Sequence, residues 1–125
     1  MYTNERRKRR GSSAGEALAL QLAACCEDGG IEAMVIADDQ GLPLASSGDA
    51  HACDEVAARM GVVAHRVREF SGTLLGPGAA WNVQMRKIEI DGADLLVCAV
   101  GGTPESRGAQ VARSAEGALR ILALA

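Results

Sequence analysis

Aromatic side chains are nearly absent from this chain of 125 residues, which has one tyrosine, one phenylalanine and one tryptophan. Because 48% of the residues are nevertheless hydrophobic, the core must be built from aliphatic side chains and methionine. Surfaces that bind single-stranded nucleic acid stack the bases on aromatic side chains, and the sequence has no such interleaved pattern. We therefore expect a domain with an aliphatic core and no nucleic-acid partner.

Lysine is also scarce, and the usual nucleotide-binding signatures are missing. Lys8 and Lys87 are the only lysines, and neither stands in the glycine pattern of a P-loop. His51 and Cys53 lie near Asp49 and Asp54, but a structural zinc site uses four ligands, usually in two pairs, and no second pair is visible. The sequence thus predicts no catalytic constellation, no metal and no cofactor, and we expect a protein that is not an enzyme.

Disulfide spacing and long apolar runs are missing too. The four cysteines, Cys25, Cys26, Cys53 and Cys98, form no C-x-x-C pair. This usage is typical of reduced thiols in a cytoplasmic protein. No apolar run approaches the roughly 20 residues that a membrane-spanning helix needs. We therefore expect a cytoplasmic location and no transmembrane segment.

The sequence does contain a sharp division of charge. Residues 6–10 read Arg-Arg-Lys-Arg-Arg, whereas residues 11–125 hold 8 basic and 15 acidic residues. The acidic part would repel nucleic acid and anionic membranes, while the basic run alone could contact an acidic protein, a membrane or a nucleic acid. Ser13 and Glu16 have the spacing of a helix capping box. We expect a flexible basic arm over residues 1–12, whose role stays open, and one domain over residues 13–125.

Apolar periodicity and turn residues predict alternating helices and strands. Helices are expected from Ser13 to Gly29, from Asp54 to about Ser71 and from Thr103 onward, and strands over residues 31–37, 42–46, 81–90 and 95–100. Pro43 cannot donate to a strand ladder, which predicts an edge strand or an irregularity. The apolar alternation shifts by one near Arg86 and Lys87, which predicts a bulge or a bend. Asp91 and Gly92 are typical of a two-residue hairpin turn.

Two turn segments admit a structural and a functional interpretation. Asp38-Asp39-Gln40-Gly41 joins the first two expected strands, and aspartates there usually bond their own backbone, although Asp38, Asp39 and Asp49 could also hold a cation. Gly101-Gly102-Thr103 precedes the last helix, whose start could bind an anion. One helix start without a charged partner is weak evidence, so we favour the structural interpretation in both places.

The expected helix from Asp54 to Ser71 has two stripes. Val56, Met60, Val63 and Val67 form an apolar stripe that we expect to face the sheet. Beside it runs a second stripe of small residues, Ala57, Gly61 and Ala64. Small residues let two backbones approach closely, so we predict that this stripe faces a partner. The alternative is that both stripes belong to the core of one chain.

The segment from Gly30 to Ser47 resembles the opening of the Roadblock family of dynein-light-chain-like proteins. It has a glycine, an apolar strand, the turn Asp38-Asp39-Gln40-Gly41 and a second strand that ends in small residues. The strand Leu95 to Val100, followed by Gly108 and Val111-Ala112-Arg113, is also similar. The resemblance covers residues 14–124 and depends on the order of the elements more than on any single motif.

The resemblance implies a profilin-like α+β sandwich of three layers. One antiparallel sheet of four to five strands would carry the long helix on one face and the N- and C-terminal helices on the other. It also implies a homodimer, or a heterodimer with a related Roadblock chain, in which the long helices pack together and the following strand pairs across the dimer. We therefore predict an interface of Ala57, Gly61, Ala64, Arg68, Trp81, Val83 and Met85.

Roadblock proteins regulate or scaffold Ras-like small GTPases, or act as adaptors, without catalytic residues of their own. The resemblance therefore implies a dimeric regulator that binds a Ras-like GTPase. A small-ligand sensor is the alternative, because profilin-like and PAS-like sheets have related shapes. A sensor needs a hollow core with inward polar residues, whereas this sequence places small apolar residues there.

Overall fold

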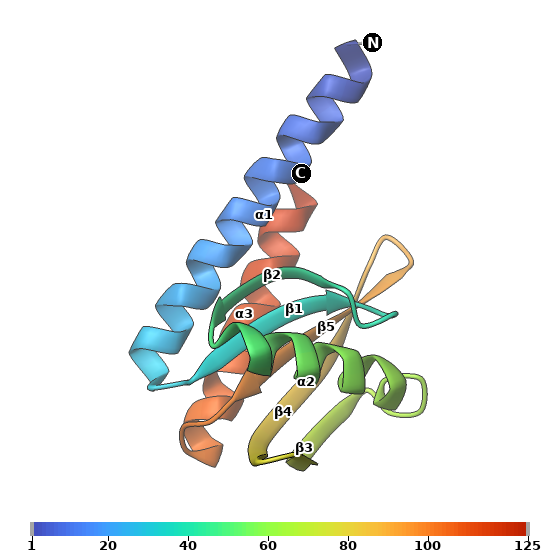
Figure 1. Ribbon diagram of the computed structural model, residues 1–125. Coiled ribbons are helices and arrows are strands. Elements are labelled where there is room, and N and C mark those ends of the chain that lie inside the picture. Colours follow the sequence, from blue (N-terminus) through green and yellow to red (C-terminus); the bar gives the residue numbers. More distant parts are fainter. Residues whose placement is uncertain (1, 125) are drawn as a thin grey trace.

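The computed structural model describes the backbone of residues 2–124 and the side chains of residues 13–124. In this part of the chain three helices and five strands follow one another as shown in Figure 1. They are α1 (Tyr2–Gly29), β1 (Ala33–Asp38), β2 (Pro43–Gly48), α2 (Ala50–Val63), β3 (Glu69–Gly76), β4 (Ala79–Ile90), β5 (Ala93–Val100) and α3 (Pro104–Ala123).

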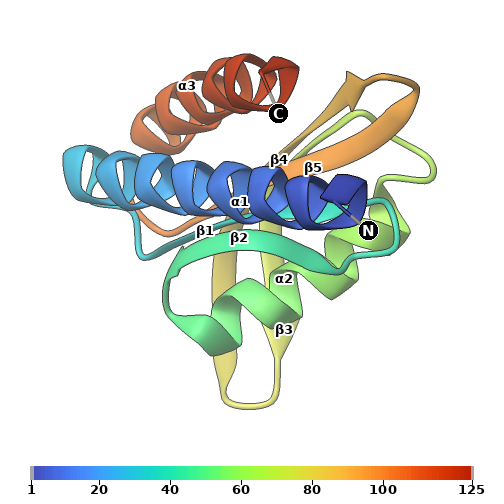
Figure 2. The same ribbon diagram turned by 90° about the horizontal axis from the view of Figure 1, so that it is seen from above.

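The strands form one antiparallel sheet in the order β2-β1-β5-β4-β3. Helices α1 and α3 lie side by side on one face, and α2 lies on the other (Figure 2). The three-layer α+β sandwich expected from the sequence is thus confirmed. Strands β2 and β3 are the two edges of the sheet within the described residues.

The sheet carries a separate core on each face, because successive strand residues point to opposite sides. In β1, Met34 and Ile36 pack under α1 and α3, while Ala33, Val35 and Ala37 pack under α2. Strand β5 alternates in the same way, so both central strands read as continuous apolar runs. Leucine, valine, methionine, alanine and cysteine side chains occur in both layers, and isoleucine adds to the layer under α1 and α3, as the scarcity of aromatics requires.

The bulge predicted near Arg86 and Lys87 is absent from strand β4. Its pairing with β5 runs without a shift from Val83 to Ile90. The apolar side chains change face because different helices cover the two halves of the strand: Met85 packs in the α2 core and Ile88 in the core under α1 and α3. When the covering helices change from one side of a strand to the other along its length, the apolar alternation shifts by one residue, just as it does at a bulge.

The first hairpin contains the irregularity that Pro43 predicts. The register between β1 and β2 shifts between Ile36 and Ala37, which stands opposite Pro43. Strand β2 is also an edge strand. At the other end of the sheet, Asp91 and Gly92 both have positive φ, 51° and 80°, as the predicted two-residue turn between β4 and β5 requires.

Helix α1 begins earlier than the sequence suggested. A capping box at Ser13 was expected to start the helix after a flexible arm, but the backbone is already helical from Tyr2. The residues that carry the basic run therefore form the first turns of α1, which extend past the end of α3 (Figure 1). Ser13 and Glu16 lie in the interior of this helix, so the predicted cap is wrong.

Helix α2 is shorter than expected at its C-terminal end. It starts at Ala50, where the N-cap Asp49 accepts a hydrogen bond from the backbone N–H of Ala52. It ends at Val63, and the chain then forms strand β3, which the sequence analysis missed. The apolar spacing continues helically through Val67 and Phe70, but the backbone from Glu69 onward pairs with β4, so sheet pairing overrides the local helical pattern.

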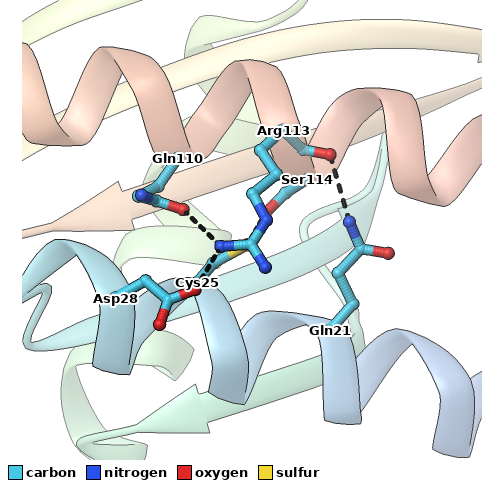
Figure 3. A network of polar contacts seen from close by, with 6 residues as sticks. All are labelled: Gln21, Cys25, Asp28, Gln110, Arg113 and Ser114. Carbon is cyan, nitrogen blue, oxygen red and sulfur yellow. Dashed lines mark hydrogen bonds and ion pairs between the residues drawn. The ribbon is translucent and has the colours of Figure 1, made fainter.

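Helix α3 starts as predicted, with Thr103 as N-cap and a proline in the first turn. It is linked to α1 by polar contacts shown in Figure 3: Arg113 donates to Asp28 at 2.6 Å, and Gln21 donates to the carbonyl oxygen of Arg113 at 3.1 Å. The hydrogen bond that Arg113 donates to the Asp28 carboxylate raises the pKa of the Arg113 guanidinium. These contacts fix the two helices as one layer.

Candidate partner-binding surface

The turn between β1 and β2 is built from its own backbone and Asp38. The Oδ1 atom of Asp38 accepts hydrogen bonds from the backbone N–H groups of Gln40 at 2.9 Å and Leu42 at 3.0 Å. Gly41 has a φ of 81°, which favours glycine. The structural interpretation of this turn therefore explains its aspartate, and the turn belongs to the scaffold of the hairpin.

The small residues of α2 contact this turn. A Cβ atom on Gly61 would lie 2.8 Å from the backbone nitrogen of Gly41, and one on Gly41 would lie 2.8 Å from the carbonyl oxygen of Ala57. Ala57 and Ala64 are 0% and 2% exposed. The prediction that Ala57, Gly61 and Ala64 face a partner is therefore wrong, because Ala57 and Gly61 lie against the hairpin of the same chain and Ala64 is buried, with its carbonyl oxygen accepting a hydrogen bond from Lys87.

Two further predicted interface residues are buried within the chain. Val83 and Met85 are fully covered beneath α2, and Val56 and Met60 contact the same core from the helix, as expected. Strand β4, which was expected to pair across a dimer, instead lies between β5 and β3. Because β3, and not β4, is the edge strand on this side of the sheet, Val83 and Met85 cannot belong to the predicted interface.

The other two predicted residues remain accessible. Trp81 is half-buried at the start of β4, and Arg68 is exposed in the loop that leads into β3. The carbonyl oxygen of Arg68 accepts a hydrogen bond from the backbone N–H of Lys87 at 2.8 Å, which anchors this loop to β4. Their assignment to a partner interface stays a prediction.

An incompletely covered apolar surface lies beside α2, and we call it the apolar strip. It consists of Val63, Phe70, Leu74 and Trp81, which are half-buried and pack against the α2 core. The rings cover glycines of β3, since a Cβ atom on Gly72 or Gly76 would lie 3.0 Å from the ring of Phe70 or Trp81, respectively. The turn between β3 and β4 extends past α2 (Figure 2), so this helix leaves the outer part of the strip open.

The outer surface of α2 combines exposed polar residues such as Asp54 and Glu55 with one exposed large apolar side chain. Val62 is 72% exposed on this helix. Arg59 reaches from α2 to β3 and donates a 2.6 Å hydrogen bond to the carbonyl oxygen of Leu75. His51 lies near Trp81, with ring centroids 5.9 Å apart and planes tilted by 59°. The helix and the edge strand are therefore held together and present one surface.

Sequence reasoning missed this surface for a definable reason. The sequence predicts a helix to about Ser71 and no strand before Trp81, so it places neither Phe70 nor Leu74 on a strand. The alternation of Phe70, Gly72 and Leu74 with Ser71 and Thr73 was the signal that could have shown it. Its two glycines weakened that signal because glycine is uncommon in strand interiors.

The metal interpretation of His51 and Cys53 gains no support. Within the described residues, no group of three or more histidine, cysteine, aspartate or glutamate side chains is placed to hold a metal ion. The Sγ atom of Cys53 instead lies 3.5 Å from the carbonyl oxygen of Met34 and 3.6 Å from that of Ser47. Burial raises the pKa of the Cys53 thiol, and it raises that of Cys98 to about 12. These protonated thiols behave as core side chains.

The opposite edge of the molecule has a shallow groove between α1 and β2. It is lined by Glu16, Ala19, Leu20, Ala23, Ser46 and Ser47.

In the stretch that the structure describes, each helix is too short or too polar to cross a membrane.

The order of the elements, the sheet order and the position of α2 alone on one face define a Roadblock-type fold. Among solved structures, MglB with a tetrameric arrangement superposes with a TM-score of 0.66 at 17% identity, over 86% of this chain and 89% of that chain. The gliding protein MglB from Thermus thermophilus has a TM-score of 0.64 at 18% identity, over 90% of this chain and 93% of that chain.

A Roadblock/LC7 domain from Streptomyces avermitilis superposes with a TM-score of 0.57 at 15% identity, over 84% of this chain and 97% of that chain. Neither a protein-family model nor a curated protein matches the sequence. At these identities the likeness establishes the fold, and the resemblance stated from the sequence is confirmed at that level.

Proposed function

We propose that this protein is a dimeric regulator that binds a Ras-like small GTPase and acts by binding, not by catalysis. The observation that carries the proposal is the apolar strip beside α2 on a Roadblock-type fold. Roadblock domains pair through the helix and edge strand that correspond to α2 and β3, and here both present accessible apolar side chains. A second copy is therefore the partner that we assign to this surface.

The chemistry of the surface supports this assignment. Val62 and the strip residues would bury aliphatic and aromatic groups together. Strand β3 would offer the outward backbone groups of an edge strand, apart from the Leu75 carbonyl that Arg59 already binds. A second β3 strand would satisfy those groups and would extend the sheet across the two chains. Exposed Arg68, next to this edge, would stand at the rim of such an interface.

The GTPase partner is what the resemblance to Roadblock proteins implies, and the solved MglB structures support the fold on which that resemblance rests. The filled core weakens the alternative of a small-ligand sensor, because leucine, valine and methionine side chains occupy both layers of the sandwich. The free thiols of all four cysteines support the cytoplasmic location as part of the same proposal.

The test begins with affinity capture from native extract of the source cells, with the tagged chain as bait. Mass spectrometry identifies the captured proteins, and chromatography identifies the released nucleotide. We expect a Ras-like GTPase enriched in one nucleotide state. The purified GTPase, loaded with GDP or with a non-hydrolysable GTP analogue, should then bind the chain with affinities that differ by about tenfold or more.

A matched variant connects this test to the proposed surface. Val62→Glu should leave the chain folded but monomeric, and binding of the GTPase should weaken if the dimer forms the docking surface. Recovery of a small metabolite and no GTPase would overturn the proposal in favour of the sensor. Turnover of a substrate by the chain alone would overturn its non-catalytic part.

A further inference from the structure

Strand β2 forms the edge of the sheet opposite β3, and most of its length lacks the features that protect an edge strand. Natural edge strands usually avoid pairing with another chain through charged side chains, prolines or bulges. The sequence of β2, Pro-Leu-Ala-Ser-Ser-Gly, contains no charged residue. Pro43 and the adjacent register shift protect only its start. Ser46 and Gly48 are exposed, so the strand after Pro43 is open to pairing.

The groove between α1 and β2 runs along this open edge (Figure 2) and has a volume of about 450 Å³. Its helix wall includes Leu20 and Ala23, which are both exposed. Leu44 on the strand itself is 49% exposed. A strand added to β2 would point alternate side chains toward α1, where they would enter the groove and cover its apolar wall. The groove therefore offers apolar burial beside the free backbone groups of the edge.

A partner segment in an extended conformation fits this edge better than a helix. A helix satisfies its own backbone groups and would leave those of β2 unpaired, whereas an added strand forms hydrogen bonds with them. The carbonyl oxygen of Ser47 already lies 4.0 Å from the Sγ atom of Cys26 and 3.6 Å from that of Cys53. Pairing would therefore use the other outward groups of the strand.

Acidic residues surround the edge and indicate the charge of its partner. Glu16 lines the groove, Asp39 lies in the turn before β2, and Asp49 directly follows the strand. All three are exposed, and none joins an ion pair among residues 13–124. Antiparallel pairing of two β2 strands would bring Asp49 of one chain toward Asp39 of the other, where like charges repel. A segment with basic ends would instead be attracted.

We propose that the β2 edge and its groove form a docking site for an extended segment of another protein, with alternating apolar side chains and basic residues at its ends. The segment pairs with β2 and adds one strand to the sheet. The site lies at the sheet edge opposite β3, so it is separate from the proposed dimer surface. It requires neither self-association nor a GTPase and goes beyond the proposed function.

The test measures binding of three labelled peptides to the full chain by fluorescence anisotropy. The first is Lys-Val-Ser-Val-Ser-Val-Lys, the second has glutamate in place of both lysines, and the third is the first with every interior backbone nitrogen methylated. We expect the first to bind saturably with a Kd of about 0.1 mM. The second should bind about tenfold more weakly because of its charge, and the third about tenfold more weakly because it lacks backbone donors.

Hydrogen exchange locates the bound peptide on the chain. The amides of Ala45–Gly48 should exchange about threefold or more slowly when the lysine peptide is present, because an added strand protects the edge. Protection confined to another part of the chain would contradict the proposed site.

Matched variants test the two walls and the charge of the groove. Ala23→Arg places a bulky cation in the groove and should weaken binding of the lysine peptide by about tenfold. Ala109→Arg, at an exposed position of α3, is its control and should change nothing. Glu16→Lys should weaken the lysine peptide and strengthen the glutamate peptide, each by about threefold. Val62→Glu, in the proposed dimer surface, should leave binding of all three peptides unchanged.

The proposal would be overturned if the lysine peptide shows no saturable binding, or if the glutamate or methylated peptide binds equally well. It would also be overturned if Ala23→Arg has no larger effect than Ala109→Arg. Protection of Ala45–Gly48 that grows with protein concentration in Val62→Glu, without peptide, would assign the edge to a second copy instead. None of these measurements involves a GTPase, so this site and the proposed function can fail separately.

Discussion

The two faces of the sheet are covered to different extents. Helices α1 and α3 together cover one face and are joined to each other by polar contacts, including the bond from Arg113 to Asp28. The other face carries α2 alone, a helix of 14 residues, which buries β1, β5 and half of β4 but leaves the apolar strip open. The incomplete face is therefore the one that has room for a partner.

A second difference lies in how closely the helix backbones approach their neighbours. On its hairpin side α2 is tightly fitted, because Gly61 lies against Gly41 with no space for a side chain. On its other side, contact is made through long side chains: Arg59 reaches the Leu75 carbonyl of β3, and His51 lies near Trp81 of β4. One helix thus has a fixed side and an adaptable side, and substitutions on the two sides should have different consequences.

The largest effect is expected at Gly61. Gly61→Glu would place a Cβ atom 2.8 Å from the backbone of Gly41, which cannot move without breaking the first hairpin. We expect the free energy of unfolding to fall by about 3 kcal/mol or more, measured by urea denaturation. A folded variant with unchanged stability would show that the hairpin turn does not rest on α2.

Gly15→Ala is the matched control for this variant. Gly15 also lies in a helix, but a Cβ atom there has no neighbour within 4 Å among the described residues. Replacement of a helical glycine by alanine then adds only helix propensity, so the free energy of unfolding should rise by about 0.5–1 kcal/mol. Because Gly61→Glu should lower the free energy of unfolding and Gly15→Ala should raise it, the pair separates steric clash from the helix propensity of the residue.

The contrast between Gly61 and the strip also shows what the sequence could and could not predict. The turns at Asp38 to Gly41 and at Asp91-Gly92, and the cap at Thr103, depend on neighbouring residues and were predicted from them. The end of α2 was not, because the helical spacing of Val67 and Phe70 competes with pairing to a strand distant in sequence.

The small stripe was misassigned for a related reason. A row of alanine and glycine shows that a backbone approaches closely, but it does not show which backbone. The structure places the hairpin of the same chain there, and the sequence resemblance had suggested a partner. The basic run was expected in a flexible arm, and its helical backbone was not anticipated, because five consecutive cations disfavour a helix by mutual repulsion.

A valine on α2 and a leucine on α1 are exposed to a similar extent, so equivalent substitutions at the two positions test the two faces against each other. Val62 on α2 is 72% exposed and Leu20 on α1 is 73% exposed. Val62→Glu should weaken self-association by about tenfold or more, since it places a charge in the proposed dimer surface, whereas Leu20→Glu should leave it unchanged. Sedimentation velocity at several concentrations measures both, and equal effects would remove the distinction between the faces.

The α2 core should also make the protein sensitive to high pH. Burial raises the pKa of Cys98 from 9.0 to about 12, so the unfolded chain loses this proton first and the folded chain retains it. The contribution of the protonated thiol is fully present below about pH 9 and decreases as pH rises toward 12. The free energy of unfolding should fall by up to about 1.4 kcal/mol per pH unit in that window.

Cys98→Ala tests the origin of this dependence. The variant should be less stable near neutral pH because a small cavity forms, but its stability should fall less steeply above pH 9. Denaturation in urea with a reductant present, at several pH values, measures both slopes. Part of the slope should remain, because burial also raises the pKa of Cys26 and Cys53. Identical slopes in the two proteins would exclude Cys98 as its source.

The smallest effect on stability is expected at the charged contact between α1 and α3, the two helices of the better-covered face. Asp28 accepts a 2.6 Å hydrogen bond from Arg113, but it also lies in the last turn of α1, where a negative charge opposes the helix dipole. Asp28→Asn removes both the favourable contact with Arg113 and the unfavourable interaction with the helix dipole. Because these two contributions to stability have opposite signs, the urea midpoint should move only slightly. Glu27→Gln removes the unfavourable dipole contribution at an exposed neighbour that joins none of the ion pairs among residues 13–124, and it should raise the midpoint.

The difference between these two variants isolates the Asp28–Arg113 pair. If the pair stabilises the layer of α1 and α3, Asp28→Asn must lie below Glu27→Gln in stability, and the gap should narrow as salt screens the charges. If the two variants have the same midpoint at low salt, the contact adds nothing to the packing of Leu22 and Val111 between these helices. The cover of this face by α1 and α3 would then rest on its apolar contacts alone.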